Sequence, residues 1–332
     1  MMAYKQVNLY NFFMLIVAIF FFGNTRAGAP VNFDTSCDIF FDISMDKNNH
    51  LHLLNHQSMQ MLYTYFKSLY LQSSSAIITP TQKPRIPLII HVIWFGGKLP
   101  QEYHGFYQSW LEKHPEWTII FWTDNEKNYD QGVRVYGFES LRELLDNKKL
   151  YNSRFVIDVA DCTFENKIFF DQADNYGEKS DILKWEVVYQ FGGLYVDVDF
   201  ECIKNLDNLH YRYDFYTGIQ PLDTNCVQLG AALFAARPRH PILQHCVETI
   251  KDDRDKEQIV VKTGPIHFTR SCIAVSNQLY NDIHTIIFPA TYFYPCSYEQ
   301  RGQPSNVWLR PESYAVHHWA GSWLKPEAFV AH

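Results

Sequence analysis

The sequence predicts an α/β fold in which helices flank a mostly parallel central sheet. Three segments carry this prediction: an apolar run over 86–94, a helical stretch over 109–113 and a second β-rich run over 117–122. Strand, helix and strand at this spacing are typical of a parallel sheet, because parallel strands need a crossover that is usually a helix. The chain has 332 residues, 47% of them hydrophobic and 20% charged, which suits one large domain or two small ones.

The boundaries of these runs also indicate strands. Ile86–Trp94 begins beside a proline and stops before Gly96-Gly97, which predicts a buried strand that ends in a loop. The second run ends at Thr123-Asp124. Phe138–Leu150 has the leucine spacing of a helix, and the polar stretch over about 158–178 predicts an inserted loop.

A second helix and strand follow in the middle of the chain. Ser180–Phe191 predicts an amphipathic helix with Ser180 at its N-cap, and Gly192-Gly193 is expected to end it. Leu194–Phe200 then has the pattern of a strand.

The N-terminal part of the chain has a different character. The apolar run Phe12–Phe22 would rise about 16 Å as a helix, which is short of the roughly 30 Å of a bilayer core. We therefore expect residues 1–29 to be a secretory signal peptide or a short membrane anchor, which allows membrane association and excludes a cytosolic resident. A helical lead-in and a linker rich in Ser, Thr and Pro are expected over 30–85, and the main domain over 86–325.

Composition excludes several classes of function. The net charge is −7 and no run of Lys or Arg occurs, which argues against a nucleic-acid partner. Seven cysteines lie apart without any Cys-x-x-Cys pair, so a zinc ribbon or a redox motif is not expected and disulfides stay undecided. Aromatic residues make up 16% of the chain, which either a ring-rich core or stacking platforms for sugars and bases would explain.

Two aspartates interrupt the apolar run Leu194–Phe200. A strand that is buried on both faces does not hold carboxylates unless they are paired or bind a metal. Because side chains alternate along a strand, Asp197 and Asp199 are expected to point to one side. Two such carboxylates suit Mn²⁺ or Mg²⁺, and such an ion can neutralise the diphosphate of a nucleotide sugar.

The residues around this Asp-x-Asp pair make the motif more specific than the pair would be alone. A capped helix, a Gly-Gly pair and a β run precede it, and this order resembles glycosyltransferase family 32, which carries a sugar-binding Asp-x-Asp motif. That family includes Golgi α-mannosyl-, α-galactosyl- and α-N-acetylglucosaminyltransferases and is distantly similar to glucosylating bacterial toxins. The matching segments, in the family's order, are Ile86–Gly97, Ser180–Lys184, Phe191–Asp199, Thr263-Gly-Pro265, Tyr292–Pro295 and Ala315–Trp323.

The resemblance implies a GT-A type nucleotide-sugar-binding fold and a metal-dependent enzyme. Such an enzyme would transfer a hexose from a UDP-sugar or GDP-mannose to a glycan, glycolipid or protein acceptor, with retention of configuration. Mn²⁺ or Mg²⁺ would be its cofactor.

The resemblance also implies which residues bind the donor. Trp94 would stack on the base, Asp181 would hydrogen-bond the sugar hydroxyls, and Tyr195 and Asp197 would contact the ribose and sugar. Lys184 departs from the family, which usually has Arg there. Lys offers a point charge where Arg offers a two-pronged clamp. The resemblance therefore implies the fold more directly than it implies the donor preference or the turnover.

The metal and the closing segment are implied in the same way. Asp199 would be the direct metal ligand, and His317 a second ligand or a diphosphate contact, although the neighbouring His318 makes the choice of imidazole ambiguous. Ser322 and Trp323 would close the site, with Ser322 also near the metal. The small residues in 317–323 predict a flexible lid.

Two other classes of function stay open from the sequence. One is a nucleotide-sugar-binding protein without turnover, for which Lys184 is the one hint. The other is a secreted carbohydrate-binding module, which would not need the carboxylate pair. Hydrolysis of glycosides is disfavoured, because Asp197 and Asp199 lie too close in sequence to flank a scissile bond.

Overall fold

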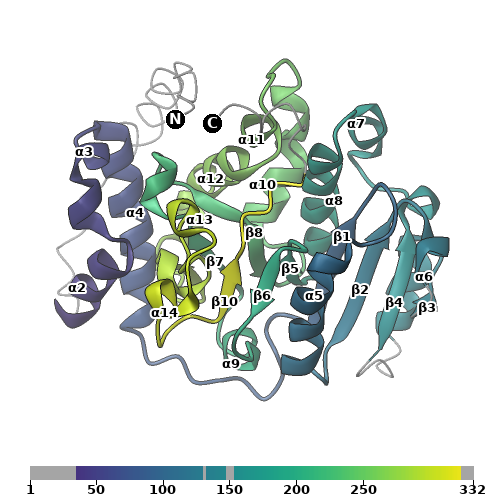
Figure 1. Cartoon of the computed structure of the whole chain (residues 1–332), viewed down its shortest axis with the longest axis horizontal. Helices are drawn as coiled ribbons and strands as arrows, with labels where there is room; N and C mark the ends of the chain where they lie inside the picture. The colour runs from purple at the N-terminus through teal and green to yellow at the C-terminus, as the bar shows by residue number, and fades with distance from the viewer. Residues whose placement is uncertain (1–34, 130–131, 147–152, 323–332) are drawn as a thin grey trace.

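The structure, a computed structural model, describes residues 35–129, 132–146 and 153–322 (Figure 1). The expected signal peptide or anchor, residues 1–29, and Trp323 lie outside these ranges. Within them, none of the helices combines the length and apolar character that a membrane crossing requires.

The core of the molecule is a mixed sheet with the strand order β3-β4-β2-β1-β5-β8-β7-β9. Neighbouring strands are parallel except where β8 runs against β5 and β7. The predicted fold class, α/β with a mostly parallel central sheet flanked by helices, is therefore confirmed. The strands are β1 Ile89–Trp94, β2 Thr118–Thr123, β3 Val133–Arg134, β4 Arg154–Asp158, β5 Gly193–Val196, β7 Phe215–Ile219, β8 Leu229–Ala236 and β9 Thr285–Phe288.

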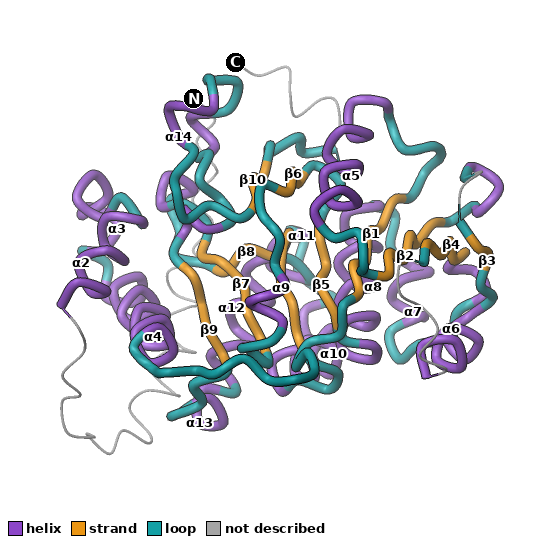
Figure 2. Tube along the Cα trace, turned by 90° about the horizontal axis from the view of Figure 1, so that it is seen from below, coloured by secondary structure: helices purple, strands orange, loops and turns teal. Residues whose placement is uncertain are grey.

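Helices cover both faces of this sheet, which explains why the central strands are apolar on both sides. Figure 2 shows α6, α7, α10 and α12 on one face, and α5 with the short pair β6 and β10 on the other. The helices are α2 Thr35–Ser44, α3 Leu51–Leu54, α4 Gln57–Ser74, α5 Gln101–Lys113, α6 Gly137–Asp146, α7 Lys167–Gln172, α8 Tyr176–Phe191, α9 Asp207–His210, α10 Pro241–Thr249, α11 Ile259–Lys262, α12 Pro265–Ala274, α13 Ser276–Leu279 and α14 Ser305–Trp308.

The helix before the Asp-x-Asp pair differs from its prediction at its start. Helix α8 begins at Tyr176, and the side chain of Asn175 caps it by accepting from the amide of Gly177 at 2.7 Å. The expected N-cap, Ser180, is therefore inside the helix. Residues 182–188 are all buried, because α7, α10 and β1 enclose α8, so the helix is not amphipathic.

The Gly-Gly pair ends α8 as predicted. Gly192 has φ 67° and caps the helix, and Gly193 has φ 108° and begins β5. A Cβ at Gly193 would lie 2.7 Å from the carbonyl oxygen of Ile89 on the neighbouring strand. Glycine is therefore required here by close packing as well as by backbone conformation.

The polar stretch over 158–178 is not an inserted loop, so that prediction is wrong. It follows β4 and contains a short 3₁₀ turn, helix α7 and the first turn of α8. Most of its polar side chains are exposed or half-buried, while Val159, Cys162 and Phe170 reach the core. Short elements with one buried residue per turn have too few apolar positions to be recognised by periodicity.

The helical lead-in is present and packs onto the main sheet. Helix α4 contacts β9, and the hydroxyl of Ser73 donates to the carbonyl of Thr285 at 2.8 Å. The chain then runs without regular structure to β1, where the amides of Thr81 and Arg85 donate to the carbonyls of Tyr211 and His210 at 3.1 and 2.9 Å.

Five histidines are built into the core as neutral imidazoles. The Nε2 of His91 lies 2.9 Å from the carbonyl of Gly192, and its Nδ1 accepts from the indole of Trp122 at 3.2 Å. Burial lowers the pKa of His91 and His114 to about 4, and that of the other three to about 3. The five are His91, His114, His210, His240 and His267.

These histidines predict acid sensitivity. Below pH 6.5 the unfolded chain binds protons at imidazoles that stay neutral in the fold, so stability is fully present above pH 6.5 and is lost as pH falls toward 4. We expect each histidine to cost about 2 kcal/mol of unfolding free energy between pH 7 and pH 5. Urea unfolding at pH 7, 6 and 5 measures this, and an unchanged midpoint would contradict it.

Candidate active site

The two aspartates of the motif lie in a turn, which corrects the strand predicted through Phe200. Strand β5 ends at Val196, and the amide of Phe200 donates to the carbonyl of Asp197 at 3.1 Å to close the turn. The chain leaves the main sheet here because β6, Phe200–Cys202, pairs instead with β10, Ala315–His317, in antiparallel register. Both carboxylates are thus placed at the end of β5, outside the ladder.

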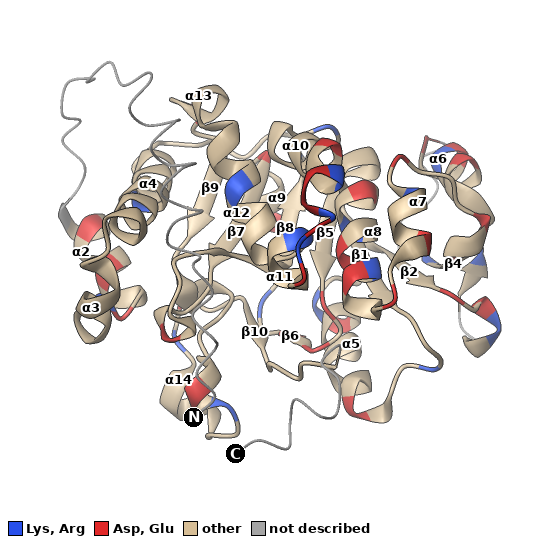
Figure 3. Cartoon of the chain, turned by 90° about the horizontal axis from the view of Figure 1, so that it is seen from above, with Lys and Arg blue, Asp and Glu red and all other residues tan. Residues whose placement is uncertain are grey.

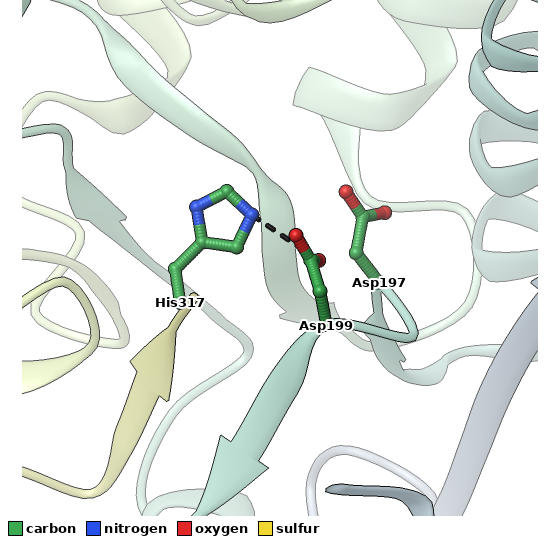
Figure 4. A group of neighbouring side chains, drawn as sticks. All are labelled: Asp197, Asp199 and His317. Carbon is green, nitrogen blue, oxygen red and sulfur yellow. Dashed lines mark ion pairs between the residues drawn. The ribbon is translucent and has the colours of Figure 1, made fainter. Parts of the chain in front are cut away.

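The β6–β10 pair brings a histidine to the two carboxylates (Figure 4). Ligand atoms of Asp197, Asp199 and His317 all lie within 4.8 Å of one another. The Nε2 of His317 is 3.3 Å from Oδ1 of Asp199, which lies between the imidazole and Asp197. The structure therefore assembles three of the predicted residues into one group that can hold a metal ion.

Backbone contacts fix this group. The second carboxylate oxygen of Asp199 accepts from the amide of Ala320 at 2.8 Å, and its carbonyl accepts from the amide of His318 at 3.0 Å. The His318 side chain turns away, with Nε2 3.0 Å from Oε2 of Glu201 and its ring stacked on Phe106. Of the two adjacent imidazoles, His317 is thus the one beside the aspartates.

The pKa values of the group are shifted by burial and by mutual attraction. Burial and the charge of Asp199 raise the pKa of Asp197 to about 6, although Lys184 opposes the rise. Burial also acts to raise the pKa of Asp199, but the imidazole of His317 holds that pKa below its ordinary value. Burial acts to lower the pKa of His317, and Asp199 overcomes this and raises it.

This donor set fits a divalent cation. Two carboxylates and one imidazole nitrogen are oxygen and nitrogen ligands of the kind that Mn²⁺ accepts, and the imidazole makes the set less suited to Mg²⁺. Nδ1 of His317 is buried and has no partner among the described residues. Its Nε2 is the nitrogen directed at the carboxylates, as the 3.3 Å contact with Asp199 shows.

A buried ion pair lies next to the aspartate turn. Lys184 is 3% exposed and its ammonium pairs with Asp181, whose other oxygen accepts from the hydroxyl of Thr263 at 3.0 Å. The ammonium also lies 5.2 Å from the ring centre of Tyr195, and the Tyr195 hydroxyl donates to Asp197 at 2.6 Å. Asp181 is in the second turn of α8 and is not the first-turn stabiliser that the sequence allowed as an alternative.

A second ion-pair group, centred on Glu178, lies one turn earlier on α8. Charges of both signs lie on α8 and along the connection from α10 to α11 (Figure 3). Glu178 accepts from Arg254 at 2.8 Å and from Lys262 at 2.9 Å. Because Lys262 precedes Thr263, these contacts fix the segment that reaches Asp181.

The predicted base-stacking residue lies at the end of β1. The Trp94 ring is partly exposed and packs 5.6 Å from the ring of Tyr103 on α5, and its indole nitrogen is buried with no hydrogen bond to any described residue. Burial and the charge of Asp199 raise the pKa of Tyr103, and a hydrogen bond with Ser322 opposes this rise. Sequence reasoning missed Tyr103, because its helix carries no motif.

The C-terminal segment begins as a strand and continues as a loop, and its closing over a donor stays a prediction. Its first residues, Ala315–His317, form a buried strand, and Trp319 is held by an indole hydrogen bond to the carbonyl of Cys296 at 2.8 Å. The small residues Ala320, Gly321 and Ser322 lie outside any helix or strand, as their composition predicted. Ser322 is exposed and lies at the edge of the described residues.

Tyr294 packs against His317 and against the glycines of β7 and β8. Its ring is 5.7 Å from that of His317 and lies against Gly218 and Gly230. A Cβ at Gly230 would be 2.0 Å from the Tyr294 hydroxyl oxygen. The aromatic motif Tyr292–Pro295 was a usable sequence signal, although it gave Tyr294 no role.

Residues 100–216 match a family model described as "Glycosyltransferase sugar-binding region containing DXD motif". In this chain that motif is Asp197–Asp199. The resemblance inferred from the sequence is therefore confirmed over this part of the chain.

Curated relatives of this sugar-binding region include mannosyltransferases. The chain is 23% identical to inositol phosphoceramide mannosyltransferase 2 of Schizosaccharomyces pombe over 55% of this chain and 45% of the relative. It is 28% identical to mannosyltransferase 3 of that series over 40% of this chain and 30% of the relative. The chain thus spans less than half the length of these two relatives.

Two further matches cover more of the chain. An uncharacterized glycosyltransferase of Acanthamoeba polyphaga mimivirus is 24% identical over 72% of this chain and 84% of the relative. Among solved structures, PaToxG glycosyltransferase matches with a TM-score of 0.45 and 18% identity, covering 74% of this chain and 83% of that one.

Gly230→Ala tests the support that Tyr294 gives to His317. The added methyl meets the Tyr294 hydroxyl, so the ring has to move, and we expect a loss of about 1–3 kcal/mol in unfolding free energy. The matched control is Gly105→Ala in α5, where a Cβ meets nothing within 4 Å; it should be neutral or stabilising by up to about 1 kcal/mol. Equal urea midpoints for the two variants would contradict the packing described.

Proposed function

We propose that this chain is a metal-dependent glycosyltransferase that moves a hexose from a nucleotide sugar to a hydroxyl of a glycan, glycolipid or protein. The observation that carries the proposal is the grouping of Asp197, Asp199 and His317 within 4.8 Å, with both aspartates in the region that matches the sugar-binding model. A carbohydrate-binding module would have no use for two buried carboxylates beside an imidazole.

The donor is proposed to lie across the end of β1 and β5. Trp94 supports this at one end, since its partly exposed ring at the end of β1 offers a face on which a base can stack. Asp181 and Lys184 are proposed to contact the sugar hydroxyls, and Tyr195 and Asp197 the ribose and sugar. Asp199, His317 and Ser322 are proposed to hold Mn²⁺ or Mg²⁺, and Trp323, with Ser322, to close the site.

The metal would supply Lewis-acid stabilisation of the departing diphosphate. The residues of the chain orient the donor and exclude water, and the buried cation of Lys184 offsets the charge of Asp181 and Asp197. We propose attack on the same face that the diphosphate leaves. The acceptor oxygen bonds to the anomeric carbon as the bond to diphosphate breaks, and the hydroxyl proton passes to the diphosphate, so configuration is retained.

The relatives narrow the substrates that we propose. Several are named as mannosyltransferases of inositol phosphoceramide, which favours GDP-mannose over a UDP-sugar and a glycolipid acceptor over a protein. The apolar run Phe12–Phe22 supports the secretory pathway as the compartment. Slow hydrolysis of one donor from a nucleotide-sugar panel would distinguish the enzyme from a binding protein without turnover.

Asp199→Ala tests the metal. A ligand that binds the folded state raises the unfolding temperature, so Mn²⁺ with GDP-mannose should stabilise the wild type. The variant should lose that rise while still folding in its absence. Asp255→Ala, which removes an exposed carboxylate, is the control and should behave as the wild type. Donor affinity that EDTA leaves unchanged in calorimetry would contradict metal dependence.

Lys184 variants test the buried ion pair. Lys184→Ala leaves the carboxylate of Asp181 buried without its cation, which we expect to cost about 3–5 kcal/mol of stability and most of the donor hydrolysis. Lys184→Arg keeps the charge and should retain most of both. Urea unfolding and hydrolysis assays measure the two effects. Full activity in the Ala variant would show that this position is not used by the donor.

A further inference from the structure

Three side chains beside the metal-ligating group have no part in the function proposed so far. They are Trp319, Tyr298 and Arg301, which we call the C-terminal ledge. The Trp319 ring centre is 4.3 Å from that of His317 and 6.2 Å from that of Tyr298. The Arg301 guanidinium lies 4.4 Å over the Tyr298 ring, and it donates to the carbonyl of Trp319 at 3.2 Å.

The ledge is held in place from several directions. Trp319 adopts φ 55° and its indole donates to the carbonyl of Cys296. A left-handed backbone at a bulky residue costs about 1–3 kcal/mol and persists where the surroundings impose it. Tyr298 begins a 3₁₀ turn, Tyr298–Gln300, that a capping box between Ser297 and Gln300 closes.

The ledge lies across the aspartate turn from the proposed base-binding residue. Trp94 ends β1, which borders β5 on one side. Trp319 is 6.0 Å from Tyr294, and Tyr294 packs against glycines of β7 and β8 on the other side of β5. With the donor base at Trp94, the ledge lies on the opposite side of β5, where an acceptor hydroxyl can approach.

The chemistry of the ledge suits a hydroxylated ring. Tyr298 is 48% exposed and presents an aromatic face next to a polar site, which can pack against the apolar face of a six-membered polyol ring. Arg301 is exposed and uses Nη1 to donate to the carbonyl of Trp319, so other N–H groups of its guanidinium can donate to hydroxyl or phosphate oxygens.

We propose that the C-terminal ledge is the acceptor subsite and that it binds a hydroxylated six-membered ring. That ring belongs either to a sugar residue of a glycan or to the cyclitol headgroup of a glycolipid. The assignment of the bound ring as acceptor rests on the proposed glycosyltransferase function. Binding of a ring by the ledge is independent of that function.

Calorimetric titration of the full chain with methyl α-mannopyranoside and with glycerophosphoinositol, without donor or metal, tests the ledge directly. We expect at least one of the two to bind, and Tyr298→Ala to weaken that binding about tenfold through loss of the aromatic face. Tyr298→Phe keeps the face and should restore it to within about twofold of the wild type. Tyr280→Ala, which removes another exposed tyrosine, is the matched control.

Arg301→Gln separates the two sources of the ring. Selective loss of glycerophosphoinositol binding would assign the phosphodiester-linked cyclitol, and an equal effect on both ligands would assign a neutral sugar. Failure of both rings to bind the wild type, or unchanged binding by Tyr298→Ala, overturns the proposal.

Transfer assays keep the two proposals apart. Sugar transfer with the same acceptor KM in Tyr298→Ala and wild type would overturn the ledge and leave the glycosyltransferase function standing. Ring binding that depends on Tyr298, together with no transfer from any donor, would overturn the function and leave the ledge as a ring-binding site.

Discussion

The pairing of β6 with β10 is the constraint on which the site depends. It sets Phe200 opposite His317, and this pairing is what places the histidine beside the two aspartates. The segment after β10 also binds Asp199 directly. The amide of His318 donates to the carbonyl of Asp199, and the amide of Ala320 donates to its carboxylate. The site is therefore closed by ordinary backbone hydrogen bonds between parts of the chain that are distant in sequence.

Charge balance explains how so many ionised groups are buried together. Carboxylates placed in a dry site are costly unless cations lie beside them. Lys184 faces Asp181 and acts on Asp197, while His317 faces Asp199. Negative charge is still in excess, since burial and Asp199 raise the pKa of Asp197 to about 6. A doubly charged cation bound at the carboxylates would balance it.

The sequence predicted some of these features and could not have predicted others. The apolar strands and the Gly-Gly stop were recognisable from the sequence. Burial on both faces of a sheet requires an unbroken apolar run, and positive φ favours glycine. The turn at Asp197–Asp199 was mistaken for strand, since alternation with valine looks the same whether or not a ladder partner exists. Tyr103 and the ledge residue Tyr298 reach the site only through tertiary packing, which no local pattern records.

The cysteines have a practical consequence. All seven lie among the described residues and none forms a disulfide. Burial raises the pKa of most of their thiols, including Cys162 and Cys246 to about 12, so they are poor nucleophiles at neutral pH. The described fold therefore contains no disulfide that a thiol reductant could break. Recombinant production can use the reducing cytoplasm of a bacterial host, and purification can keep a thiol reductant throughout, even for a chain that begins with an apolar export-like segment.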